Sequence, residues 1–139
     1  MAEKRKPVDI KRVLSIDFSD LTEDLAESLK LYGYYGEQAA RAWGKARMAR
    51  QKRENIAGQL YFISKEDVLE NGRPPSDKYV EYELTQDPDW QTAQKEYSEA
   101  KVVAEKASVL VRGLEFKLDS LRTLMANERL DKQQHLKDH

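Results

Sequence analysis

The chain has no cysteine and few residues that interrupt helices. Its 139 residues include four prolines and six glycines. Without cysteine there is no disulfide framework, no thiolate nucleophile and no Cys-based zinc site, which suits a reducing compartment. No run of about 18 apolar residues occurs, so we expect no membrane span and no membrane partner. Because the N-terminal MAEKRKPVDI also lacks the apolar core of a secretory signal, we expect a cytoplasmic protein.

Residues suited to catalysis are equally scarce. The only histidines are His135 and His139, at the polar end of the chain, and neither a GxxxxGK[ST] nor a GxGxxG phosphate loop is present. Carboxylates are plentiful, but on long helices most of them lie on solvated faces. We therefore expect no enzyme, no catalytic residue, no metal and no cofactor.

Apolar and small residues instead recur in a long heptad pattern. Between residues 20 and 63 there is no proline, and the spacing alternates between four and three. This spacing predicts one long helix with a single packing seam, with Ser19 or Asp20 as its N-cap. Gly33 and Gly36 weaken the helix and mark a possible kink. The seam residues are Leu21, Leu25, Ser28, Tyr32, Tyr35, Ala39, Ala42, Ala46, Ala49, Arg53, Ile56, Leu60 and Ile63.

A second heptad helix is expected from Pro88, with Asp87 in front of it, to the 120s. Its seam is Trp90, Ala93, Tyr97, Ala100, Ala104, Ala107, Val111, Leu114, Leu118, Leu121 and Met125. Further apolar residues lie off this seam between 102 and 118, which is more apolar surface than one partner helix covers. We therefore expect self-association, and the candidate interface residues are Val103, Ala107, Leu110, Val111, Leu114 and Leu118.

The segments between and beyond these helices complete the predicted fold. Asn71-Gly72 and Pro74-Pro75 are turn signals, and Ser76 is the expected N-cap of a short helix to about Leu84. The chain thus divides into a basic flexible tail (1–12), a single helical domain (13–130) and a frayed polar C-terminus (131–139), with a short extended piece at 13–18. The predicted fold is all-α: two long helices in an antiparallel hairpin with a short helix in the connection, assembled into a homo-oligomer.

The segment RAWGKARMARQKR, residues 41–53, holds six Lys or Arg and no acidic residue, although the net charge of the chain is only −1. On a helix these cations form two stripes, and a Trp ring among arginines suits single-stranded DNA, whose bases stack on the ring while cations neutralise phosphates. Binding without base readout is expected. The candidate DNA-binding residues are Arg41, Trp43, Lys45, Arg47, Arg50, Lys52 and Arg53.

Other interpretations of the same residues stay open at this point. Trp43 would equally pack against another helix or subunit. The basic run would be an ordinary solvated helix face, or it would pair with the acidic segments 66–70 or 81–89 of another subunit. Arg53 lies on the seam, where a charge acts as a packing-specificity device as readily as a ligand group. For the whole protein, the alternative to DNA binding is a structural or adaptor coiled coil that acts through helix–helix contacts.

The order of features resembles that of the UvsY-type recombination mediators of T-even-like phages. A short IDF stretch (16–18) leads into the first helix, and an aromatic LYGYY (31–35) lies one-third along it. The basic run then ends in the paired aromatics Tyr61-Phe62. After an acidic loop come Tyr79, a TQDPDW entry (85–90) and a second helix rich in Ala, Val and Leu.

This resemblance implies a non-catalytic mediator in the cytoplasm of the host cell. Such a protein would form a ring-like homo-oligomer, bind single-stranded DNA covered by single-strand binding protein, and help load a RecA-like recombinase. One position departs from the family. The family has a DNA-binding Lys-x-Arg site just before the paired aromatics, and this chain has Ile56-Ala57-Gly58 there. The DNA-binding role of that site can therefore be transferred only to Lys52 and Arg53, which lie earlier in the chain.

Overall fold

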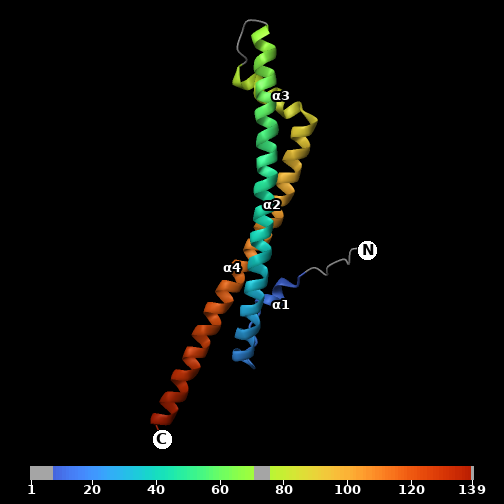
Figure 1. Cartoon of the computed structure of the whole chain (residues 1–139). Helices are drawn as coiled ribbons and strands as arrows, with labels where there is room; N and C mark the ends of the chain where they lie inside the picture. Colours follow the sequence, from blue (N-terminus) through green and yellow to red (C-terminus); the bar gives the residue numbers. More distant parts are fainter. Residues whose placement is uncertain (1–7, 71–75, 139) are drawn as a thin grey trace, which may run out of the picture. The chain divides into compact units, whose positions relative to one another are not determined.

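In the computed structural model, which describes residues 8–70 and 76–138, the chain is all-helical and the described residues contain no strand (Figure 1). The order is α1 (Ile10–Leu14), α2 (Leu21–Glu70), α3 (Asp77–Gln86) and α4 (Pro88–Lys137). This confirms the predicted fold class and the two long helices. Within the described residues, no helix has the length and apolar character needed to cross a membrane.

The chain forms two compact units, each containing a length of α2 and a length of α4. The terminal unit comprises Met1–Ala39 and Lys106–His139, and the middle unit comprises Ala40–Glu105. In the terminal unit the Tyr32 hydroxyl donates a 3.0 Å hydrogen bond to Glu115 on α4. In the middle unit Lys52 forms a 3.3 Å ion pair with Glu96. The two long helices therefore pack against each other, as predicted.

Both predicted seams are used in this packing. Ser28, Ala39 and Ala46 are the buried seam residues of α2. Their counterparts on α4 include three leucines in the terminal unit and only alanines in the middle unit, where small side chains allow a close helix approach. The buried seam residues of α4 are Ala93, Ala104, Leu114, Leu118 and Leu121. At one end the pattern fails, because Ile63 is 55 % exposed although it continues the seam of α2.

Side-chain caps fix where the described helices begin. Of the two candidate caps for α2, Asp20 serves, because its carboxylate accepts a 3.0 Å hydrogen bond from the Glu23 N–H. Ser76 caps α3, as predicted. Asp87 accepts hydrogen bonds from the N–H groups of Asp89 and Trp90 at 2.9 and 3.0 Å, directly before Pro88 in the first position of α4.

Of four expectations about the segments between and beyond the long helices, three need correction and one lies outside the described residues. The stretch 13–18 is not simply extended, and the tail 1–12 is not wholly irregular. Both contribute to α1, because Ile10, Val13 and Leu14 follow a helical spacing and Asp9 caps the helix. Helix α4 continues to Lys137 rather than ending near Asn127, and its late pair Lys132–Glu128 (3.6 Å) is of the helix-stabilising i,i+4 type. The turn signals in 71–75 lie outside the described residues.

Helix α2 is continuous through its glycines, and an added methyl group at Gly33 or Gly58 would meet no atom within 4 Å. We expect Gly33→Ala and Gly58→Ala each to raise the free energy of unfolding by about 0.5–1 kcal/mol, since Ala loses less backbone entropy in a helix. Urea denaturation measures this. Gly113→Ala is the control, because its Cβ would lie 2.8 Å from a Leu14 methyl carbon and should not give the same gain. A loss of stability in Gly33→Ala would show that the glycine serves a bend.

Candidate nucleic-acid interface

The basic run lies on α2 within the middle unit, and the regular helix sorts its side chains into two stripes. Successive residues turn by about 100°, so the seam residues lie between the stripes. One stripe, called the first basic stripe, contains Arg41, Lys45 and Lys52. The other, called the tryptophan stripe, contains Trp43, Arg47 and Arg50. All six residues are exposed, and Trp43 is 37 % exposed.

Few of these cations are strongly neutralised by the chain itself. Arg50 pairs with Glu54 at 3.0 Å and Lys52 with Glu96 at 3.3 Å, but each of these side chains is about half exposed or more. Such surface pairs contribute little stability, so a phosphate can compete for the cation. The side chains of Lys45 and Arg47 form no hydrogen bond or ion pair with any residue that the structure describes.

Arg53 does not belong to this exposed set. Its guanidinium lies 4.5 Å from the centre of the Tyr97 ring and donates a 2.6 Å hydrogen bond to the Gln94 side chain on α4. Arg53 is half-buried between the two helices. In this structure Arg53 is a helix-packing residue with one guanidinium N–H directed at Gln94 of α4, and its assignment to DNA binding stays a prediction.

Exposed aromatic side chains accompany the basic stripes in the same unit. Besides Trp43, the pair Tyr61 and Phe62 further along α2 is 39 % and 70 % exposed. A Trp followed at i+4 and i+7 by arginines places a stacking surface beside phosphate-binding groups on one helix face. The first basic stripe offers charge without an aromatic ring.

The candidate oligomer interface on α4 is only partly available. Leu110, Leu114 and Leu118 are 8 %, 0 % and 4 % exposed, because α2 and the N-terminal segment cover this side of α4. These three residues belong to the core of a single chain, which corrects their assignment to a contact between chains. Ala107 and Val111 are half-buried, and Val103 is 59 % exposed. The other exposed apolar residues of α4 between 102 and 118 are Val102, Val109 and Phe116.

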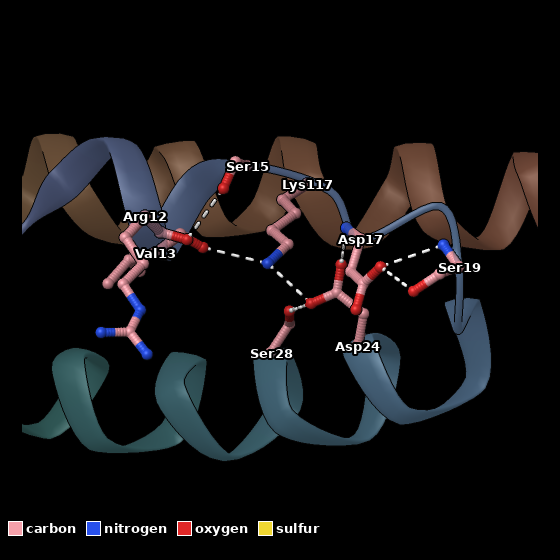
Figure 2. Close-up of polar contacts among 8 residues, drawn as sticks. All are labelled: Arg12, Val13, Ser15, Asp17, Ser19, Asp24, Ser28 and Lys117. Atoms are coloured by element: carbon pink, nitrogen blue, oxygen red, sulfur yellow. Dashed lines mark hydrogen bonds and ion pairs between the residues drawn. The ribbon is translucent and has the colours of Figure 1, made fainter.

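The sequence did not single out the most buried charge of the terminal unit, Lys117. Its ammonium group forms an ion pair with Asp24 of α2 at 2.9 Å and donates to the Val13 carbonyl oxygen of α1 at 3.0 Å (Figure 2). The side chains of Lys117 and Asp24 are 5 % and 11 % exposed. The sequence signal for this pair was Ser28, a polar residue on the otherwise largely apolar seam of α2. In the structure Ser28 is fully buried and its hydroxyl donates a hydrogen bond to Asp24.

The same carboxylate also organises the connection between α1 and α2. Asp24 accepts a 2.8 Å hydrogen bond from the Asp17 N–H and a 3.3 Å bond from Ser28 (Figure 2). Burial alone would raise the pKa of Asp24, but the hydrogen bonds from Lys117, the Asp17 N–H and Ser28 and the charge of Lys117 together lower it. Asp24 is thus held ionised, and we assign the cluster to holding α1 and its connection on α2 and α4.

Among the described residues there is no group of three or more His, Asp or Glu side chains arranged to hold a metal ion. The candidate interface consists of the two exposed stripes on α2. Compared with known proteins, the chain matches no protein-family model, no curated protein and no solved structure.

Proposed function

We propose that the protein binds single-stranded DNA without base specificity and acts as a recombination mediator. The observation that carries the proposal is the exposed tryptophan stripe, in which Arg47 lies one helical turn from Trp43 and forms no ion pair with the described residues. Lys45, on the first basic stripe, adds a second exposed cation of the same kind.

The chemistry of these side chains suits single strands better than duplex. Arg and Lys contact phosphates of any sequence, and an indole ring stacks on bases only where the bases are unpaired, at about 1–3 kcal/mol per base. The stripes carry no set of Asn, Gln or paired Arg side chains placed to read base edges. The proposed role is therefore to hold a strand through its backbone while leaving the bases largely accessible.

The mediator part of the proposal is supported by the resemblance to UvsY-type proteins. In this proposal the protein loosens single-strand binding protein from DNA, and a RecA-like recombinase then assembles on the strand. A homo-oligomer would present several copies of a weak site to one strand, which raises avidity without new contacts. Exposed Val102, Val103, Val109 and Phe116 on α4 are the large apolar residues available for that assembly.

The test is a binding titration of labelled oligo-dT by fluorescence anisotropy at several salt concentrations. We expect Lys45→Ala/Arg47→Ala to weaken binding about tenfold and to lower the slope of log K against log salt by about 1.4, two phosphates at about 0.7 each. Both side chains are exposed, so the fold should persist. The control, Lys106→Ala/Arg112→Ala, removes the same charge from exposed positions on α4 and should bind nearly as the wild type does.

An equal loss of DNA affinity in both variants would show that binding depends only on the overall charge of the chain. It would contradict the assignment of the DNA site to Lys45 and Arg47. Absence of binding at low salt would leave the second candidate function, an adaptor that acts through helix contacts. One observation favours that candidate: Val109 and Phe116, seven residues apart on α4, are 64 % and 74 % exposed. In that case Phe116→Ala would weaken association with a protein partner, and salt would hardly affect it.

A further inference from the structure

Helix α3 carries an exposed face with a regular pattern that the proposed function does not use. Val80 is buried, at 9 % exposure, and Leu84 is half-buried, so these residues define its packed side. Flanking this packed side, the residues at i, i+3, i+4 and i+7 from Tyr79 are all exposed, with Tyr82 62 % exposed. This α3 face consists of Tyr79, Tyr82, Glu83 and Gln86.

The charge of the segment around this face is opposite to that of the basic run. Residues 77–89 contain Asp77, Glu81, Glu83, Asp87 and Asp89 against a single Lys78. Neither Glu83 on the α3 face nor Arg47 on α2 forms an ion pair with any residue that the structure describes. The middle unit therefore carries two exposed helix faces of complementary charge that do not neutralise each other within the chain.

A contact within the chain shows which groups bind an arginine side chain on a helix surface. On α4, Arg53 is held by Tyr97, whose ring centre lies 4.5 Å from its guanidinium, and by the side-chain oxygen of Gln94, at 2.6 Å. The α3 face presents the same kinds of group: tyrosine rings beside the side-chain oxygens of Glu83 and Gln86. Tyrosine rings and carboxylates suit the guanidinium of an arginine better than the ammonium group of a lysine, because the guanidinium is planar, stacks on rings and donates two parallel hydrogen bonds.

We propose that the α3 face of one chain docks on the tryptophan stripe of a second copy, with Arg47 and Arg50 against Tyr82, Glu83 and Gln86. Arg50 exchanges its exposed Glu54 partner at little cost, since that pair is 60 % and 49 % exposed. The two faces differ, so each copy uses one of each, and the contact is heterologous, building closed rings or open chains. This contact uses arginines that single-stranded DNA would also bind, so the two compete.

Light scattering coupled to size-exclusion chromatography tests the contact on the full chain without DNA. At about 50 mM salt we expect the mass to be roughly twofold or more above its value at about 500 mM, where charge attraction is screened. Glu83→Lys/Gln86→Lys and Arg47→Glu/Arg50→Glu should each abolish the low-salt increase. An equimolar mixture of these two variants should restore it, because each then offers a face complementary to the other.

Matched variants make the same change in charge on other sides of the same helices. Glu81→Lys/Thr85→Lys on α3 and Arg41→Glu/Lys45→Glu on α2 involve exposed residues outside the proposed contact. Both should retain the salt-sensitive mass increase. A wild-type mass that does not depend on salt, or a mixture that fails to restore the increase, would overturn the contact. Either result would leave the proposed DNA binding to its own test, the titration of oligo-dT.

Discussion

Lys117→Met is expected to lower the free energy of unfolding by about 3–5 kcal/mol, because it leaves the carboxylate of Asp24 buried without its counter-charge. The two side chains are 5 % and 11 % exposed, so water replaces little of the lost interaction. The substitution also removes the donor to the Val13 carbonyl oxygen. Urea unfolding followed by circular dichroism measures the loss.

The control is the same change at an exposed pair. Lys52→Met removes the ion pair to Glu96, whose side chains are 60 % and 49 % exposed, and we expect an effect of at most about 1 kcal/mol. A second control, Arg12→Ala, shortens an exposed cation on α1 that lies near the cluster but outside its hydrogen bonds (Figure 2). If Lys117→Met were no more damaging than Lys52→Met, the buried pair would not hold the segment.

The pH dependence of stability gives a second readout of the same cluster. The pKa of Asp24 is lower in the folded chain than its ordinary value of about 3.9. Its contribution is therefore complete above that ordinary value and is lost as pH falls through the folded-state pKa. In Lys117→Met the buried carboxylate of Asp24 has lost its counter-charge, so protonation removes an unfavourable buried charge. The difference in free energy of unfolding between the wild type and Lys117→Met should therefore become smaller in acid. A constant gap down to about pH 2 would contradict this account.

Leu114→Ala is the second large effect, with an expected loss of about 2–5 kcal/mol. Leu114 is 0 % exposed within one chain, so the truncation leaves a cavity between α2 and α4 rather than a gap between subunits. The loss should be the same at all protein concentrations, because it arises inside the chain. Thermal or urea unfolding at two concentrations separated by a factor of about ten measures this.

Phe116→Ala is the matched variant two residues away. Phe116 is 74 % exposed, so its truncation should change the free energy of unfolding of the single chain by less than about 0.5 kcal/mol. If this side chain contributes to self-association, the variant lowers the mass of the assembly instead. If Leu114→Ala altered assembly without altering stability, Leu114 would belong to an interface between chains, as the sequence pattern alone suggested.

Local chemistry in the sequence was sufficient to predict the two long helices and the short helix between them, but not α1 or the full length of α4. The three-four alternation from Leu21 and from Trp90 predicts both long helices because a heptad period is a property of neighbouring residues on one helix. Ser76 and Asp87 are predicted caps for the same reason, since a cap bonds to N–H groups two or three residues away. The exposed basic stripes also follow from sequence, because residues flanking a seam point away from it.

Only the tertiary structure decided which of these side chains remain accessible and which charges are neutralised. Leu110 lies off the seam and became buried, whereas Val103, also off the seam, stayed exposed. The seam position of Arg53 left two roles open and nothing in the sequence distinguished Lys117 from other cations, yet one is held by Tyr97 and the other by Asp24. These two contacts join Arg53 to Tyr97, 44 residues away, and Lys117 to Asp24, 93 residues away. Helical periodicity carries no information about which distant residue a side chain will meet.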